Sequence, residues 1–572
     1  MMPKRSKVWD FYDKQPDSGV CKICKSKVKR SGNTSNLHSH LRNSHELLYA
    51  EKFDKLDTTD QTDIATSFKN IQSVKSGHFK EQIDMALFWW IISDCRPFKI
   101  VESAEFVSFI KSLNSQYVLP KRKAVTSNIL RLYKTKKELV VTHLKTIEMF
   151  SLTSDIWTDQ MNSRSYIGLT LHYLDGYEQK SICIGARNFD ESHTAINIAD
   201  IITSILSDYD IPMEKVISFT TDSASNMIAA VNHLSIPHVK CVAHRINLLV
   251  LDSMEESESL QLTSKVKNIV TFFKQSNLAN NMLREEQIKD SVEPLKLKQD
   301  CCTRWNSTFF MLERYLFLRN YVSIALRKLN REDLDINYDE IEILNDMVKC
   351  LNHFYKMTND IMGEKYITIS RVIPLVTGVN FVLEKTHCKT ERGLKLKAAL
   401  QDNLEKRFGM VEKNEIFAFS TLLDPRFKKI DFRSPLNCSH AVTKLNEKLR
   451  VVPLTQEIQQ PVDVEDLWSY HESRVRSLCD ASYGLNSGLK HYFELVNLAI
   501  DDNPLNFWKN NKGNWHHLHN LALKYLNIPA TSVPCERLFS KTGSIISEKR
   551  NRIKPELVDA LCFLESLPIM FR

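Results

Sequence analysis

The spacing of hydrophobic and polar residues changes several times along this chain of 572 residues, and each change marks a predicted boundary. Residues 51–80 are polar and have no sustained apolar period, which predicts a linker. From Glu81 onwards apolar residues recur at helical spacing, and Pro120 ends one of these stretches. Residues 81–146 are therefore predicted to form a helical N-terminal domain.

Between residues 147 and 257 the pattern becomes that of strands. Four segments are rich in β-branched and aromatic residues and predict strands at 149–158, 166–174, 180–189 and 215–222. An amphipathic helix is predicted at 194–209, because its isoleucines share one side. Residues 238–252 predict a further short strand and a helix. Strands combined with helices in this way predict an α/β sheet.

From residue 258 to residue 515 the strand signals fade and helical spacing dominates. A long all-α segment is therefore predicted to follow the sheet, with residues 516–572 closing the chain. A chain of this length is expected to divide into three or four units. The predicted fold class is thus α/β plus all-α.

Composition and charge indicate a cellular compartment and a class of binding partner. The most apolar stretch, residues 85–92, is short enough to be a core helix, so no membrane span and no signal peptide are predicted. Thirteen scattered cysteines indicate a reducing compartment. Residues 1–50 contain ten basic and four acidic residues and so carry +6 of the net charge of +8. This favours a polyanion-binding module at the N-terminus, with a solvated basic tail as the alternative.

A metal site is predicted inside this basic segment. Cys21 and Cys24 are separated by two residues, and His40 and His45 by four, with 15 residues between the pairs. Two thiolates on a turn and two imidazoles near a helix end suit one tetrahedral Zn²⁺. His38 is the competing ligand. The sequence therefore predicts a zinc finger in residues 1–50.

Residues 5–47 resemble the BED finger, a DNA-binding module, through "KVWDFYDK", the cysteine pair and "TSNLHSHLRNSH". The resemblance implies that basic side chains contact phosphates, namely Lys25, Lys27, Lys29 and Arg30. It also implies that polar residues at the start of the helix face base edges, namely Ser35, Asn36 and Ser39. The opening "PKRSKV" favours nuclear import.

Two aspartates stand where apolar strands are predicted to end. Asp222 follows "VISFTT", and Asp155 follows "FSLTS". A lone buried carboxylate is unfavourable, whereas strand ends of α/β sheets are where ligands bind. Either aspartate alone is explained as a strand-end or helix-capping residue. Together they suggest a divalent metal site, which a third acid would complete for work on a phosphodiester.

Six motifs in order resemble the hAT family of DNA transposases, in its Ac-like branch: "SDIWTD", "TTDSASNM", "CVAHRINLLV", "CCTRWNSTFFMLER", "STLLDPRFK" and "IPATSVPCERLFSKTG". The resemblance implies a ribonuclease-H-like catalytic core interrupted by a large helical insertion. The core would comprise residues 147–257 and 516–572, and the insertion residues 258–515. Residues 81–146 would then serve DNA binding or assembly.

The same resemblance implies an Asp-Asp-Glu triad of Asp155, Asp222 and Glu536 that binds Mg²⁺ or Mn²⁺. Asp159 competes locally with Asp155, but we expect it to lie past Trp157, outside the strand. Cys535 stands where serine is more common in the family, and Ser223 where asparagine is common. Neither difference removes a metal ligand.

The resemblance implies roles for three further residues. His244 would contact or orient the scissile phosphate or a water beside the metals; with Cys241 it forms a Cys-x-x-His pair that offers zinc as the alternative. Trp305 would stack on a base flipped from the duplex, with core packing as the alternative. Arg304 would pair with phosphate.

The resemblance predicts a nuclear cut-and-paste transposase that binds terminal or subterminal repeats and target DNA and assembles as a homodimer or larger oligomer. The C-terminal region would contribute to that assembly, and the apolar face of Leu557, Ala560 and Leu561 would pack on a partner or within the chain. Two alternatives stay open: a domesticated nuclear DNA-binding protein or transcription regulator that no longer transposes, and a zinc-dependent scaffold that does not use the acids.

Overall fold

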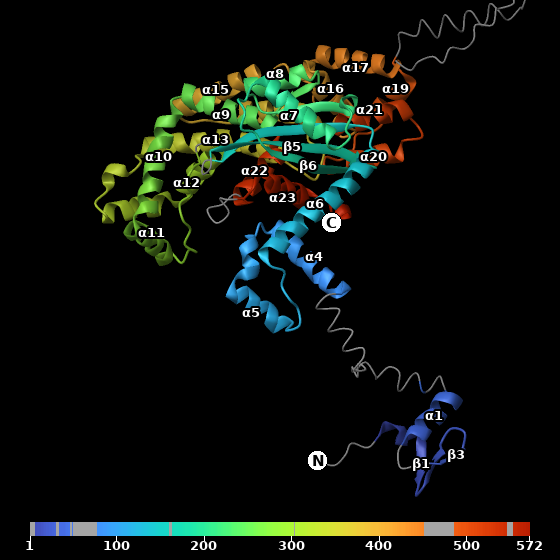
Figure 1. The fold of residues 1–572 in the computed structure, drawn as a ribbon. Helices are drawn as coiled ribbons and strands as arrows, with labels where there is room; N and C mark the ends of the chain where they lie inside the picture. Colours follow the sequence, from blue (N-terminus) through green and yellow to red (C-terminus); the bar gives the residue numbers. More distant parts are fainter. Residues whose placement is uncertain are drawn as a thin grey trace, which may run out of the picture. The chain divides into compact units, whose positions relative to one another are not determined.

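The computed structural model describes residues 6–29, 34–45, 49, 77–159, 163–301, 304–450, 485–545 and 553–572 (Figure 1). The chain divides into two compact units. The first comprises Met1–Leu87 and Val101–Pro120, and the second Phe88–Ile100 and Lys121–Arg572. Most of the predicted linker, residues 51–76, lies outside the described residues.

The first unit contains the predicted finger. A short 3₁₀ helix (η1, Lys7–Phe11) precedes an antiparallel sheet in the order β1-β2-β3 and one helix. Their bounds are Tyr12–Gln15 (β1), Ser18–Cys21 (β2), Lys27–Lys29 (β3) and Ser35–Ser44 (α1). A small core of Val8, Trp9, Tyr12, Cys21, Leu37, Leu41 and Tyr49 joins sheet and helix. The Tyr12 hydroxyl donates a buried hydrogen bond of 2.8 Å to the Leu37 carbonyl.

Helices dominate residues 81–146, for which helical spacing was predicted, and the first of them begins at His78, inside the predicted linker. The elements are α4 (His78–Ser93), η3 (Phe98–Glu102), α5 (Ala104–Leu113) and α6 (Arg122–Leu144). α6 packs on α23 (Pro555–Ser566), and Tyr133 on α6 donates a hydrogen bond of 3.3 Å to Asp559. Within the second unit, α6 therefore packs with the C-terminal segment of the chain.

The second unit is built on a five-stranded sheet in the order β6-β5-β4-β7-β8. The strands are β4 (Phe150–Asp159), β5 (Arg164–Asp175), β6 (Glu178–Asn188), β7 (Val216–Thr221) and β8 (His238–Lys240). β5 pairs antiparallel with β4 and β6, while β7 pairs parallel with β4 and β8. The predicted strands are confirmed, and so is the mixed α/β class.

One expectation about β4 is wrong. Asp155 does not end the strand, and Asp159 does not lie outside it, because β4 continues to Asp159. Pairing with β5 extends the strand, since Asp159 is in register with Arg164. Asp159 is also buried, with 3% of its surface exposed.

Helices cover both faces of the sheet (Figure 1). The short 3₁₀ turn η4 (Met213–Lys215) leads into β7, and the flanking helices are α7 (Ala195–Ser207), α8 (Ser225–His233), α9 (Val242–Glu256), α22 (Val533–Ile545) and α23. α7 lies against Gly185, where a Cβ would be 2.8 Å from Ile205. α22 lies against Gly168 on the opposite face. The chain thus returns to the sheet after the helical segment.

The helical segment packs around one large hydrophobic core. Its helices are α10 (Ser259–Gln275), α11 (Asn277–Lys289), α12 (Trp305–Lys328), α13 (Tyr338–Ile361), α14 (Val372–Lys385), α15 (Glu391–Phe408), α16 (Glu415–Leu422), α17 (Pro435–Arg450), α19 (Ser487–Glu494), α20 (Pro504–Asn510) and α21 (His516–Leu526). Short 3₁₀ turns are η5 (Glu332–Leu334), η6 (Ile369–Arg371), η7 (Val411–Lys413) and, at the C-terminus, η9 (Ile569–Phe571). The core includes Leu518, Ala522 and Leu526, so this packing continues past residue 515.

The apolar face of α23 is buried inside the chain. Leu557, Ala560 and Leu561 are at most 8% exposed, and α23 packs on β6 and α6. Of the two alternatives for this face, packing within the chain is the one observed. In the described part of the chain, no helix has the length and apolar character needed to cross a bilayer.

Candidate functional site

The finger brings its four predicted ligands together. The ligand atoms of Cys21, Cys24, His40 and His45 all lie within 4.8 Å of one another. Cys21 Sγ is 3.5 Å from His45 Nε2, and Cys24 Sγ is 3.3 Å from His40 Nε2. Hydrogen bonding to Ser26 lowers the pKa of the Cys24 thiol to about 5, which favours the thiolate that binds metal. This Cys₂His₂ group suits Zn²⁺.

His38, the competing zinc ligand, contacts Tyr49 instead. His38 Nδ1 lies 3.3 Å from the hydroxyl of Tyr49, and its ring packs edge-on against the Tyr49 ring. His38 is not among the four clustered ligands.

The predicted DNA-contacting residues of the finger are exposed wherever they are described: Lys25, Lys27, Lys29, Ser35, Asn36 and Ser39. Asn36 also donates a hydrogen bond of 3.2 Å to the Lys29 carbonyl, which ties the start of α1 to β3. Arg30 lies outside the described residues.

Asp155 and Glu536 approach each other because of a glycine. Asp155 on β4 is in register with Gly168 on β5. A Cβ on Gly168 would be 2.6 Å from Phe539 and 2.8 Å from the sulfur of Cys535, so only glycine allows α22 to lie this close. Cys535 directly precedes Glu536. The sequence motifs gave no signal for Gly168, since its role depends on a strand register.

The electrostatics of Asp155 show that the three acids are neighbours. Burial, followed by the charges of Asp222 and Glu536, raises the pKa of Asp155 to about 7. Its Oδ1 accepts a hydrogen bond of 2.9 Å from the N–H of Ile156, which acts in the opposite direction. Carboxylates held together in this way favour a divalent cation or a proton.

Asp222 directly follows β7, as predicted, and is half-buried. Its Oδ1 accepts a hydrogen bond of 3.1 Å from the N–H of Ala224 at the start of α8. Among the described residues, the finger is the single place where three or more such ligand atoms lie within 4.8 Å of one another. The carboxylates of the three acids are therefore more widely spaced than the zinc ligands.

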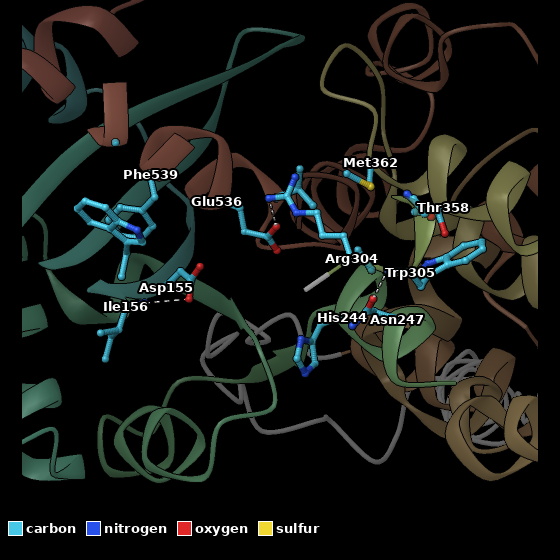
Figure 2. Close-up of a pocket in the computed structure, with 15 residues that line it drawn as sticks. Asp155, Ile156, His244, Asn247, Arg304, Trp305, Thr358, Met362, Glu536 and Phe539 are labelled. Carbon is cyan, nitrogen blue, oxygen red and sulfur yellow. Dashed lines mark hydrogen bonds and ion pairs between the residues drawn. The ribbon is translucent and has the colours of Figure 1, made fainter. Parts of the chain in front are cut away.

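A pocket of about 610 Å³ opens beside Asp155 and Glu536 (Figure 2), and Asp222 is not among the residues that line it. Its walls include Asp155 from β4, Glu536 from α22, His244 from α9, and Arg304 and Trp305 at the start of α12. Arg304 Nη2 lies 3.5 Å from Glu536 Oε2. Five predicted residues, from four separate motifs, thus line one cavity.

Trp305 is buried in this structure. Its side chain is 3% exposed and packs within the helical core, with its ring 6.3 Å from that of Phe309. Its backbone N–H donates a hydrogen bond of 3.0 Å to Asn247 Oδ1, which fixes the start of α12 to α9. The burial supports the core-packing alternative for this conformation.

Another aromatic pair lines the pocket beside Asp155. Trp157 is half-buried and stacks on Phe539, with ring centroids 6.1 Å apart and planes inclined by 22°. Trp157 belongs to the motif "SDIWTD", but no site role was predicted for it. Its place on the same strand as Asp155, two residues further on, is the signal that could have identified it.

Cys241 has a structural contact. It is fully buried, its sulfur accepts a hydrogen bond of 3.3 Å from the N–H of Ser532, and burial raises its pKa. Within the described residues Cys241 and His244 belong to no group of three metal ligands. Cys241 thereby links the start of α9 to the segment before α22.

Comparison with protein families identifies four domains in order. The chain matches the BED zinc finger over residues 6–46, the ZBED1 RNase-like domain over 153–243, the ZBED1 RNase-like helical domain over 239–350, and the hAT family C-terminal dimerisation region over 488–567.

Known proteins show similarity along most of the chain. A protein named Putative AC transposase from Zea mays is 25% identical, over 94% of this chain and 71% of its own length. Human Zinc finger BED domain-containing protein 4 is 23% identical, over 99% of this chain and 52% of its own length. Putative transcriptional regulator tpeD from Talaromyces stipitatus is 23% identical, over 83% and 60%. The chain thus combines matches to a BED zinc finger and to the hAT family C-terminal dimerisation region, and it is similar both to proteins named as AC transposases and to proteins named for their BED fingers.

Proposed function

We propose that the chain is a DNA transposase of the cut-and-paste type, with Asp155, Asp222 and Glu536 as its catalytic acids. One observation carries the proposal: three acids that are distant in sequence act on one another, since burial of Asp155, followed by the charges of Asp222 and Glu536, raises the pKa of Asp155 to about 7. Such a cluster is unfavourable without a compensating cation. The pocket beside Asp155 and Glu536 offers space for a nucleic-acid backbone.

The fold supports a ribonuclease-H-like core interrupted by a helical insertion. The five-stranded sheet carries helices on both faces, and α22 and α23 return to it after the helical segment. The match to an RNase-like domain over residues 153–243 covers β4 to β8. We assign the core to residues 147–257 and 516–572 and the insertion to 258–515, with α21 (His516–Leu526) packed against the insertion.

The three acids would hold Mg²⁺ or Mn²⁺, since carboxylate oxygens are the ligands that these ions prefer. Such an ion, when bound, supplies the charge that activates water or a 3′-hydroxyl and stabilises the phosphodiester under attack. Asp155 has to be deprotonated to take part, so its raised pKa ties ligand binding to pH. His244 lines the same pocket and would orient the phosphate or a water, and Arg304 would pair with phosphate.

The finger supplies DNA binding in this proposal. The exposed lysines Lys25, Lys27 and Lys29 would neutralise phosphates, and Ser35, Asn36 and Ser39 at the start of α1 would face base edges. The dimerisation region supports a homodimer or a higher oligomer. A nuclear location follows from the DNA substrate.

A second candidate function is that of a domesticated DNA-binding protein or transcription regulator. The similarity to human Zinc finger BED domain-containing protein 4 over 99% of this chain, and to a protein named as a putative transcriptional regulator, favours it. The two candidates differ in whether the acids perform chemistry.

The deciding experiment uses the purified full chain and a DNA duplex that carries the terminal inverted repeats flanking its gene. We expect Mn²⁺-dependent strand cleavage that falls at least about a hundredfold in Asp155→Asn, Asp222→Asn and Glu536→Gln, because each removes a metal ligand. Repeat binding should persist in all three, since the finger uses other residues.

Asp159→Asn does not serve as a control, because Asp159 is buried on β4. The exposed Asp200 on α7 is the matched choice, and Asp200→Asn should cleave like the parent. Cleavage by Asp222→Asn at the parental rate, or a gene without flanking repeats whose product binds DNA and leaves it intact, would establish the regulator instead.

A further inference from the structure

The residue after Glu536 connects the helix that carries it to the helical segment. Arg537 Nη2 donates a hydrogen bond of 3.0 Å to the Met362 carbonyl, and its Nη1 pairs with the carboxylate of Glu364. Met362 and Glu536 both line the pocket. A single guanidinium on α22 thus contacts the loop that follows α13 at the wall of the site.

Contacts within the loop that follows α13 hold its shape. The Tyr366 hydroxyl donates a hydrogen bond of 2.7 Å to the Asp360 carbonyl, and Arg371 Nη1 lies 2.6 Å from Asp360 Oδ1. The Arg371 guanidinium lies 4.4 Å from the centre of the Tyr366 ring. A Cβ on Gly363 would be 2.2 Å from that ring, so the turn closes tightly on Tyr366. Arg537 therefore contacts a loop with a defined shape.

α22 thus makes two separate sets of contacts close to Glu536. Cys535 and Phe539 pack over Gly168 on the sheet, and Arg537 contacts the loop of the helical segment. Packing over Gly168 sets how closely the helix approaches β5. The Arg537 contacts set the direction in which the first turn of α22 faces, and Glu536 lies in that turn.

We infer that Arg537 is a positioning residue: it fixes Glu536 in the pocket by fastening α22 to Met362 and Glu364, so that the helical segment controls the geometry of the acid cluster. This inference rests on the proposed function, because it concerns the metal affinity of the same three acids. Arg537 itself would not touch the reacting atoms.

A role in folding and a role in positioning predict different results. The side chains of Arg537 and Glu364 are 42% and 56% exposed, so water screens their ion pair and the pair contributes little to stability. Loss of a group that orients a metal ligand, by contrast, typically lowers metal affinity about 10- to 100-fold. The predicted effect therefore falls on Mn²⁺ affinity and spares the melting temperature.

The test titrates Mn²⁺ into the full chain, with zinc retained in the finger, and records heat of binding and thermal melting without DNA. Arg537→Ala should weaken Mn²⁺ binding at least about tenfold and shift melting by no more than about 2 °C. Arg537→Lys keeps a charge but loses the planar fork, so it should recover only part of the affinity. Glu364→Gln leaves the Met362 contact intact and should weaken binding about threefold, between the parent and Arg537→Ala.

Glu536→Gln separates this inference from the proposed function. If Glu536→Gln weakens Mn²⁺ binding while Arg537→Ala and Glu364→Gln bind like the parent, the positioning role is overturned and the proposed site stands. If Glu536→Gln binds Mn²⁺ like the parent, or the parent binds none, the proposed site fails and the inference fails with it. Should Arg537→Ala not fold, Arg537→Lys and Glu364→Gln decide by the same criterion.

Discussion

Arg304 Nη2 and Glu536 Oε2 are 3.5 Å apart across the candidate site, although the two residues are 232 positions apart in the chain (Figure 2). Arg304 precedes α12 of the helical segment, and Glu536 lies in the first turn of α22. A carboxylate that is proposed to bind a metal is therefore paired with an organic cation in this structure. The Arg304 guanidinium and the metal ion would compete for the carboxylate oxygens of Glu536.

This competition predicts that Arg304→Gln tightens Mn²⁺ binding to the full chain. The Arg304 side chain is 64% exposed, so the pair is worth at most about 1 kcal/mol, which corresponds to a gain in affinity of up to about fivefold. Calorimetric titration of Mn²⁺ without DNA measures the gain. Phosphate loses a partner at the same time, so DNA cleavage should fall.

The control for this variant is Arg284→Gln, which removes an exposed arginine from α11 and should leave Mn²⁺ affinity unchanged. Weaker Mn²⁺ binding by Arg304→Gln would contradict the competition and would mean that Arg304 helps to build the metal site.

The acid cluster predicts an unusual dependence of stability on pH in buffer without Mg²⁺ or Mn²⁺. The pKa of Asp155 is about 7 in the folded chain, against 3.8 for an ordinary aspartate. Between these values the folded state binds the additional proton, so stability falls as pH rises through this window. The shift corresponds to about 4 kcal/mol. Melting at a series of pH values measures it.

Asp155→Asn removes this titration. The variant should match the parent near pH 4 and melt at a higher temperature than the parent at pH 8, where the parent carries the buried charge. Asp200→Asn on the exposed side of α7 is the control and should keep the parental pH profile. A parent whose stability rises steadily from pH 5 to pH 8, with Asp155→Asn following it, would show that the three acids do not interact.

The finger predicts one zinc ion per chain in its first 50 residues. Cys24→Ser removes one of four ligands and should abolish stoichiometric zinc and repeat-specific DNA binding, because small zinc modules depend on the metal to fold. Metal analysis and a DNA-binding titration measure the two effects. His38→Asn is the matched control, since His38 contacts Tyr49 and should leave zinc content intact.

The local pattern of side chains predicts part of this structure correctly and does not predict the rest. The strands β4 to β7 and the four zinc ligands follow from side-chain type and spacing, which are local properties. The end of β4 was misplaced, because pairing of Asp159 with Arg164 extends the strand. Strand register depends on pairing with a second strand, and the side-chain pattern within one strand does not report it.

The candidate site, too, was predicted from the sequence only in part. The motifs indicated the acids, but the cause of their proximity, the packing of Cys535 and Phe539 over Gly168, depends on how β5 aligns with β4. The burial of Trp305 was likewise left open by the sequence, since an aromatic residue at the start of a helix suits either a core or a binding surface.

Trp305 permits a test that distinguishes these two roles. With 3% of its surface exposed and its ring among core residues of α12, its removal should leave a cavity and cost about 3–5 kcal/mol. We therefore expect Trp305→Ala to lower the melting temperature by about 3–5 °C without DNA, while Trp305→Phe retains most of the stability. The backbone hydrogen bond from residue 305 to Asn247 persists in both variants, so the difference reports the side chain alone. If Trp305→Ala melts like the parent and loses cleavage of the repeat duplex, the indole acts on DNA: the side chain would then leave the core in the complex and stack on a base, a contact worth about 1–3 kcal/mol.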